Sequence, residues 1–310
     1  EECKKLVASG VVEITLLGQT VNHYRYTHGV AIGINGQEVP QIGPGLTAFK
    51  KEIVETQKVT TFASLLQRIH DEIPNLLRLR FVTSYPIDFG DDILNVMRDC
   101  PRICNYLHVP AQSGSNRILK KMNRGYTVEE YLEFIERARR IIPDVEIAGD
   151  IIVGFCSETE EDYEATRKLL EQVRFKNNFV FHYSPRPGTV AIDRYIDDVP
   201  RADKKRRLNA LLELGATISG EVHASYEGKR VDVFVEKISP LSSKHRDVEL
   251  KWERQSIQLS GRTPGDLICV FEVDSEERAQ ELLGTIVQVE IESSAPLLLK
   301  GHLAASVVSK

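Results

Sequence analysis

Five short polar motifs could bind a ligand, because each directly follows an apolar run that is typical of a buried strand. The motifs are Gly18-Gln19-Thr20, Thr83-Ser84-Tyr85-Pro86, residues 110–115 (PAQSGS), residues 154–159 (GFCSET) and residues 183–189 (YSPRPGT). In α/β folds, ligands collect at the carboxyl ends of parallel strands. Each motif alone is typical of a turn, but five at one edge favour a shared ligand surface. Residues 154–159 would add the N–H groups and positive dipole of a helix start.

Two ionisable residues belong to these strands. Asp150 lies inside an otherwise apolar run (IAGDIIVG), where a carboxylate needs either a partner or a ligand, and the sequence leaves both open. His108 precedes Pro110 at another strand end. A lone histidine in this position is more often a hydrogen-bonded core residue than a ligand, and we expect that for His108.

The five cysteines do not form a cluster motif. Cys100 and Cys104 are spaced C-x3-C, but an iron–sulfur site needs three or four thiolates, and Leu107 stands where a third cysteine would be. We therefore expect no metal ligands in this chain. Cys156 and Cys269 are expected to be small buried residues. So few scattered cysteines, without a signal peptide, favour the reducing cytoplasm over a disulfide-stabilised secreted protein.

One basic run stands out. Lys204, Lys205, Arg206 and Arg207 follow Arg201 at the start of a helical pattern. The run is either the solvated start of a helix or a set of phosphate contacts. Residues 221–310 hold 11 Lys and Arg and 15 Asp and Glu, a net charge of −4, which argues against a broadly basic face there.

Alternating elements must position these motifs. Short apolar runs predict strands over residues 12–17, 77–83, 105–109, 145–153 and 178–183. Helical periodicity predicts helices over residues 62–73, 128–142 and 159–173. Repeated strand–helix units imply parallel strands, in either a doubly wound sheet or a β/α barrel. Residues 29–45 are a glycine-rich interruption that suggests a hairpin or loop insertion.

The last third has a different character. One long helix is predicted over residues 201–225, and alternating strands over residues 229–235, 267–273 and 285–291. Short alternating strands at this spacing fit a small all-β barrel. The domain boundary is therefore expected near residues 220–228.

Composition excludes several classes of protein. The 310 residues are 42% hydrophobic and 27% charged, which is ordinary for a folded protein and excludes a mainly disordered one. The net charge of −5 gives no global electrostatic case for nucleic-acid binding. No apolar run is long enough to span a membrane. The chain opens with Glu1 inside an amphipathic pattern, and we expect it to be a fragment or a processed form.

The motifs, taken together and in order, resemble the MiaB-type tRNA methylthiotransferases of the radical-SAM methylthiotransferase family. The resemblance is carried by residues 13–22 (EITLLGQTVN), 81–86 (FVTSYP), 108–127 (HVPAQSGSNRILKKMNRGYT), 150–163 (DIIVGFCSETEEDY) and 183–191 (YSPRPGTVA). Gly261-Arg262-Thr263 with the following strand, and residues 284–291, resemble the family's C-terminal TRAM domain.

The resemblance implies an α/β fold class: a partial radical-SAM (β/α)6 barrel in residues 1–220, without its first strand and cluster loop, then a TRAM β-barrel in residues 221–310. It implies that S-adenosylmethionine (SAM) is cleaved to a 5′-deoxyadenosyl radical at a [4Fe–4S] cluster. A methylthio group is then placed on C2 of an isopentenylated adenosine beside the tRNA anticodon. The family's two clusters use cysteines absent from this chain, so these residues alone are expected to be inactive. A flavodoxin-type reductant is the implied electron donor.

The resemblance also implies site residues by position. Gln19, Ser84, Gln112, Ser113 and Asp150 are expected near SAM. Lys121 and Arg186 are expected near the phosphate or base of the substrate, and the catalytic residues are not identified.

Two other functions stay open. One is a non-catalytic RNA-binding remnant, and the other is a methylthiotransferase acting on a ribosomal-protein aspartate. Gln112-Ser113-Gly114 resembles the tRNA branch, where the ribosomal branch tends to have Gln-His, whereas the acidic TRAM segment leans towards the ribosomal branch.

Overall fold

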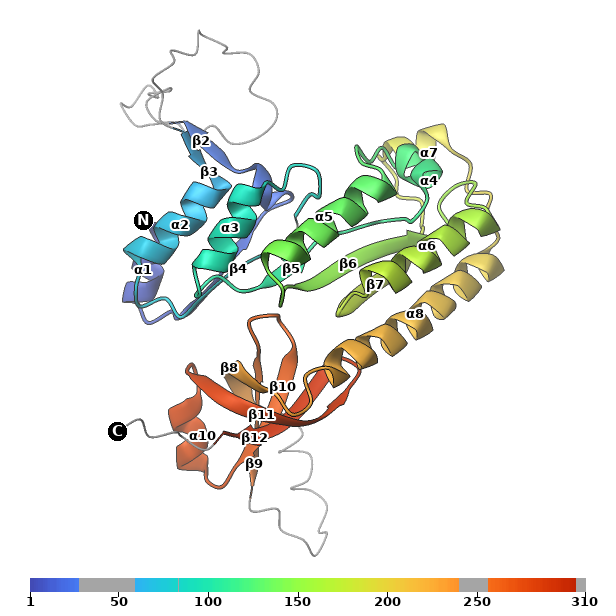
Figure 1. Ribbon diagram of the computed structural model, residues 1–310. Coiled ribbons are helices and arrows are strands. Elements are labelled where there is room, and N and C mark those ends of the chain that lie inside the picture. The colour runs from blue at the N-terminus through green and yellow to red at the C-terminus, as the bar shows by residue number, and fades with distance from the viewer. Residues whose placement is uncertain (28–58, 83, 240–255, 305–310) are drawn as a thin grey trace, which may run out of the picture. The chain divides into compact units, whose positions relative to one another are not determined.

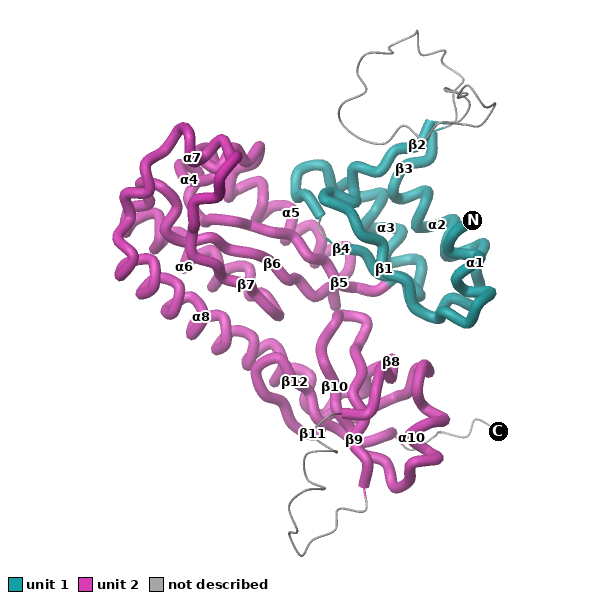
Figure 2. Tube along the Cα trace, turned by 180° about the vertical axis from the view of Figure 1, so that it is seen from behind, with its two compact units in different colours: residues 1–103 teal, residues 104–310 magenta. Residues whose placement is uncertain are grey.

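The computed structural model describes residues 1–27, 59–82, 84–239 and 256–304. The chain divides into two compact units, residues 1–103 and 104–310 (Figure 2). The glycine-rich segment 29–45 lies outside the described residues. No helix in the described ranges is long and apolar enough to cross a membrane.

The first unit contains a parallel strand pair with helices. Its elements are α1 (Glu2–Ala8), β1 (Glu13–Leu17), the 3-10 turn η1 (Val21–His23), β2 (Arg25–Thr27), β3 (Val59–Thr61), α2 (Phe62–Glu72), β4 (Arg78–Val82) and α3 (Asp91–Asp99). Strands β1 and β4 pair in parallel, and β2 and β3 form a short antiparallel pair. Leu66, Leu79, Phe81, Phe89 and Leu94 are buried in its core.

The second unit begins with a three-stranded parallel sheet. Its elements are β5 (Tyr106–His108), α4 (Asn116–Lys121), α5 (Val128–Ile141), β6 (Glu146–Val153), α6 (Glu160–Val173), β7 (Asn177–His182), α7 (Val190–Arg194) and α8 (Arg201–Ala224) (Figure 1). Strand β6 is central and pairs in parallel with β5 and β7. Ile147, Ile151 and Val153 are buried on β6, and α8 packs against β7. All three strands therefore end on the same side of the sheet, named the carboxyl edge, and begin on the opposite side, named the amino edge.

The same unit ends in a closed five-stranded barrel. Its elements are β8 (Arg230–Ile238), β9 (Ile257–Arg262), β10 (Ile268–Val273), α10 (Glu276–Leu282), β11 (Ile286–Ala295) and β12 (Leu298–Leu303). The strand order is β10-β12-β11-β8-β9, and Val233, Phe271 and Leu299 lie in its core. A Cβ on Gly261 would lie 2.1 Å from the Phe234 carbonyl oxygen, so the barrel closes there only over glycine.

Buried polar contacts attach the barrel to the amino edge of the sheet. Lys176, directly before β7, donates to the Asp266 carboxylate at 2.7 Å. Tyr226 donates its hydroxyl proton to Glu146, the first residue of β6, at 2.5 Å. Burial lowers the pKa of Lys176 and raises that of Glu146, and the facing partners oppose both shifts. The barrel therefore lies at the end of the sheet opposite to the carboxyl edge.

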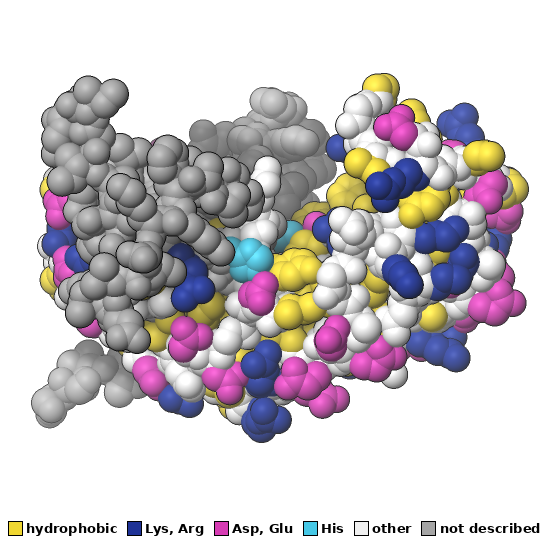
Figure 3. Space-filling view, turned by 90° about the horizontal axis from the view of Figure 1, so that it is seen from above, with side chains coloured by type: hydrophobic (Ala, Val, Ile, Leu, Met, Phe, Trp, Pro, Cys, Tyr) yellow, Lys and Arg dark blue, Asp and Glu magenta, His cyan; other side chains and the backbone are white. Residues whose placement is uncertain are grey.

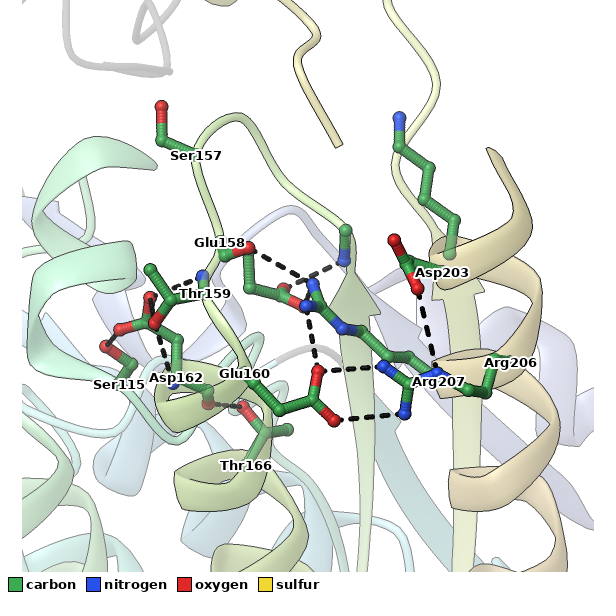
Figure 4. A network of polar contacts seen from close by, with 12 residues as sticks. Ser115, Ser157, Glu158, Thr159, Glu160, Asp162, Thr166, Asp203, Arg206 and Arg207 are labelled. Carbon is green, nitrogen blue, oxygen red and sulfur yellow. Dashed lines mark hydrogen bonds and ion pairs between the residues drawn. The ribbon is translucent and has the colours of Figure 1, made fainter. Parts of the chain in front are cut away.

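A second buried network holds the carboxyl edge (Figure 4). Glu158 accepts a hydrogen bond from the Gly154 N–H at 2.8 Å and pairs with Arg207 of α8 at 2.9 Å. The side chains of Glu158 and Arg207 are only 2% and 6% exposed. Arg207 and Arg206 also contact Glu160. This network ties the loop after β6 to the first turns of α8.

Asp162 joins the same loop to the turn after β5. It forms the capping box of α6 with Thr159. It also accepts hydrogen bonds from Ser115 at 2.5 Å and from Arg117. Burial alone would raise the pKa of Asp162, but the hydrogen bonds from Arg117, Ser115 and Thr159 outweigh it and lower the pKa to about 2.

Replacing Arg207 by Ala should destabilise the fold by about 3–5 kcal/mol, because Glu158 would remain buried without its counter-charge. Urea unfolding at neutral pH measures this. The matched control is Arg206→Ala, since the Arg206 side chain is 51% exposed. That change should cost less than about 1 kcal/mol. Equal losses in the two variants would contradict this account of the network.

Asp162 should make the protein less stable in acid. Its folded pKa of about 2 lies below the ordinary 3.8, so the stabilisation is fully present above pH 3.8 and is lost as the pH falls towards 2. Asp162→Asn should lower stability at neutral pH, and its stability should depend less on pH between pH 3.8 and 2 than that of the unchanged protein. Unfolding midpoints between pH 2 and about 6 test this. Identical slopes in the two proteins would disprove it.

Candidate functional site

Asp150 and His108 form an ion pair or hydrogen bond across neighbouring strands. The His108 Nε2 lies 3.1 Å from an Asp150 carboxylate oxygen. Their side chains remain 16% and 26% exposed, so both stay within reach of a ligand. His108 is thus hydrogen-bonded, as expected from the sequence, and it is the partner that Asp150 needs. No sequence pattern indicates this pairing, because 42 residues separate His108 from Asp150.

An aromatic surface adjoins this pair. Phe179 lies opposite Asp150 in the register of β7 against β6, with its ring centroid 6.5 Å from that of His108. Phe181 is two residues along the same face of the strand. Phe179 and Phe181 are 46% and 54% exposed, which is unusual for phenylalanine. A carboxylate beside exposed aromatic rings suits a ligand with hydroxyl groups and a flat heterocycle.

Gln112 occupies a strained position at the carboxyl edge. Its N–H donates to the Asp150 carbonyl, and its carbonyl accepts from Ile152, so it extends the pairing of β5 with β6. Its φ of 66° is left-handed, which is uncommon for any residue except glycine and costs about 1–3 kcal/mol. Gln112 is 8% exposed, and its side-chain amide has no partner among the described residues. A largely buried side chain on a strained backbone, whose amide group is left for a ligand, suits a binding role.

Ser113 instead serves the turn that follows. Its hydroxyl contacts the Thr166 hydroxyl at 3.4 Å and accepts from the Ser115 N–H at 3.2 Å. Gly114 donates to the same threonine at 2.9 Å, and a Cβ on Gly114 would clash with α6. Ser113 therefore holds the turn beside Gln112, and its hydroxyl is already engaged.

Gln19 and Ser84 belong to the first unit. Each follows the end of a strand, β1 and β4 respectively, so both lie at the carboxyl edge of that parallel pair. Gln19 is exposed, whereas Ser84 is 4% exposed and its hydroxyl has no hydrogen-bond partner among the residues that the structure describes. Asn22 and Tyr85 exchange two hydrogen bonds, of 3.0 and 2.8 Å, that fix the turn containing Ser84. The role of Asn22 was not anticipated from the sequence.

Lys121 and Arg186 lie near the carboxyl edge of the second unit. Lys121 ends α4, with its ammonium group 5.5 Å from the centroid of the Tyr195 ring. Arg186 is exposed and forms no ion pair with a described residue. Figure 3 shows Lys and Arg side chains among apolar ones where α4, α7 and the start of α8 lie. The edge therefore presents cations around a partly apolar surface.

The cysteines described here do not offer a cluster site. Burial raises the pKa of the Cys100 and Cys156 thiols, and raises that of Cys269 to about 12. A thiol that stays protonated is a poor metal ligand. Within the described ranges, no group of three or more His, Cys, Asp or Glu side chains is placed to hold a metal ion. These residues do not fit an iron–sulfur cluster, whereas the free groups of Gln112 and Ser84 fit a polar organic ligand.

Comparison with known proteins identifies the family. The model of the Radical SAM superfamily matches residues 1–170. A tRNA-2-methylthio-N(6)-dimethylallyladenosine synthase from Rhodopirellula baltica is 41% identical over 90% of this chain and 51% of its own length. A synthase of the same name from Pelodictyon phaeoclathratiforme is 38% identical over 97% of this chain and 58% of its own. The chain thus spans little more than half the length of these relatives.

Among solved structures, the chain is similar to coproporphyrinogen III oxidase from Escherichia coli, a radical SAM enzyme. The match covers 70% of this chain and 57% of the oxidase chain at 14% identity, with a TM-score of 0.40. The resemblance to MiaB-type enzymes is confirmed by the synthases. The predicted fold class, a radical-SAM α/β part followed by a small all-β barrel, is confirmed by the family model and the closed five-stranded barrel. The chain belongs to the Radical SAM superfamily.

Proposed function

We propose that this chain is part of a radical-SAM methylthiotransferase. Its substrate is the isopentenylated adenosine beside the tRNA anticodon, and its product carries a methylthio group on C2 of that base. The observation that carries the proposal is the 38–41% identity to the two synthases over 90% or more of the chain. The other two functions open from the sequence, an RNA-binding remnant and a ribosomal-protein methylthiotransferase, have no comparable support.

The described residues would bind and orient SAM. Asp150 can accept hydrogen bonds from ribose hydroxyls or from an ammonium group, with His108 fixing the carboxylate. Phe179 and Phe181 offer faces on which adenine can stack. The side-chain amide of Gln112 can both donate and accept a hydrogen bond. Ser113 fixes the turn that positions Gln112. From the family resemblance alone, Gln19 and Ser84 of the first unit are also proposed as SAM contacts.

The radical chemistry itself is supplied by SAM and a [4Fe–4S] cluster when both are bound. The family resemblance implies two such clusters and a flavodoxin-type reductant. The described residues contribute binding, orientation and exclusion of water.

On the substrate side, Lys121 and Arg186 would contact the phosphate or base of the tRNA anticodon loop, where an unstacked base can be read. We assign SAM and base binding to residues 1–220, and further RNA contacts to the barrel domain, residues 221–310. Such an enzyme would act in the cytoplasm, where its tRNA substrate is found.

Loss of the gene tests the proposed reaction. In the deletion strain, the 2-methylthio nucleoside should disappear from total tRNA while the isopentenylated precursor accumulates. Liquid chromatography with mass spectrometry measures both, and complementation with the intact gene is the control. Unchanged tRNA together with loss of the methylthio group on a ribosomal protein would assign the gene to the other branch.

Two substitutions test the SAM site in the full-length protein. Asp150→Asn and Gln112→Ala should each weaken SAM binding roughly tenfold, because each removes a protein group that would form a hydrogen bond with SAM. Isothermal titration calorimetry measures the affinity. Asp274→Asn is the matched control, since Asp274 is an exposed carboxylate outside the sheet with no described partner. If both site variants bind SAM within twofold of the affinity of the unchanged protein, Asp150 and Gln112 do not belong to the SAM site.

A further inference from the structure

A groove of about 830 Å³ lies beside the carboxyl end of β7, separate from the His108–Asp150 pair. Three segments line it: the loop of Tyr183, Ser184 and Pro185; the stretch from Asp197 to Pro200; and the first turns of α8. In Figure 1 these segments lie at the α7 end of the second unit. None of the roles assigned above uses this groove.

The acidic residues of the groove are already engaged. Asp197 accepts a hydrogen bond from Lys204 at 2.5 Å. Asp198 accepts from the Ser157 N–H at 2.6 Å and from the Ser157 hydroxyl at 3.0 Å. Both carboxylates therefore hold the wall of the groove together.

Two cations of the groove have no such partner. Arg201 and Lys205 are exposed, line the groove, and form no ion pair with any residue that the structure describes. They are four residues apart on α8, which places their Cβ atoms about 5–6 Å apart on one face of the helix. Adjacent charges at this spacing suit two oxygens of one phosphate or two neighbouring phosphates.

The rest of the basic run has a structural role. Lys204 is buried and bonded to Asp197. Arg207 is paired with Glu158 and Arg206 with Glu160 (Figure 4). These contacts fix the orientation of the first turns of α8. Of the two sequence interpretations, a solvated helix start fits Arg206, whereas Lys204 and Arg207 are buried in ion pairs and fit neither interpretation. Phosphate contact remains open for Lys205 and Arg201.

We propose that this groove binds the phosphate backbone of the RNA substrate, with Arg201 and Lys205 as the contacts. The proposal rests on the proposed tRNA-modifying function and adds a second attachment point outside the site of the reacting base. Arg186 directly follows the groove-lining Pro185, so the groove is continuous along the chain with the expected substrate site. These contacts read charge and position the RNA without specifying a base.

The test compares the full-length protein with its Arg201→Gln, Lys205→Gln double variant. A fluorescein-labelled anticodon stem-loop RNA is titrated at several salt concentrations, with fluorescence anisotropy as the readout. The double variant should bind roughly tenfold more weakly, and the slope of log affinity against log salt should shrink by about 1.4, at about 0.7 per lost contact. Thermal unfolding verifies that the variant folds, and the two single variants replace it if it does not.

The matched control is Arg140→Gln with Lys168→Gln. These are also one exposed arginine and one exposed lysine of the second unit without a described ion pair, on α5 and α6. They should change the affinity less than twofold. An equal loss of RNA affinity in the control variant would show a general effect of positive charge and would overturn the groove proposal.

Two further outcomes separate the possible failures. If the wild type binds the RNA and the double variant binds it equally well, the groove proposal is wrong and the proposed function stands. If the wild type binds SAM but not the RNA, the tRNA substrate itself is wrong, and the groove proposal falls with it.

A calorimetric titration with inorganic phosphate adds a third arm. Phosphate binding lost in the double variant, with RNA affinity unchanged, would identify a free-anion site and overturn the proposal.

Discussion

The buried pair of Glu158 and Arg207 is the interaction on which the arrangement of the carboxyl edge depends. Glu158 is almost completely excluded from water, so it requires both the Gly154 N–H and the Arg207 guanidinium. Through these contacts the loop after β6 is fixed to α8, and through Asp162 it is fixed to the turn after β5. The network thus holds the loop of Gln112 and the first turns of α8, which carry Arg201 and Lys205, in fixed positions beside the ends of β5 and β6.

Helix α8 connects the two ends of the second unit. Its 24 residues span about 36 Å. Its first turns carry the network and the cationic groove, and its last turn leads to the barrel, which Lys176 and Glu146 hold at the amino edge of the sheet. An RNA that reached both the groove and the barrel would have to extend along this helix.

The repeating elements could be predicted from the sequence because their signals are local. The strands through Ile14, Phe81 and Ile151 and the helix through Phe134 were placed to within a few residues. Strand β9 was missed because Ser260 and Gly261 interrupt its alternation, and β12 because consecutive leucines obscure it. Contacts between distant residues were out of reach. Neither the pairing of Asp150 with His108 nor the engagement of the Ser113 hydroxyl by Thr166 has a sequence signature. Charge type alone also could not separate structural Arg207 from unpaired Lys205.

The central claim is that SAM binds at the carboxyl edge of β5 and β6. Hydrogen–deuterium exchange of the full-length protein, with and without SAM, tests it most directly, because it maps the contact without altering a residue. If SAM binds there, exchange should become slower in peptides covering residues 106–116 and 146–154 and should stay unchanged in the barrel segment 276–303. Protection confined to the barrel, with the two strand-end segments unchanged, would contradict it.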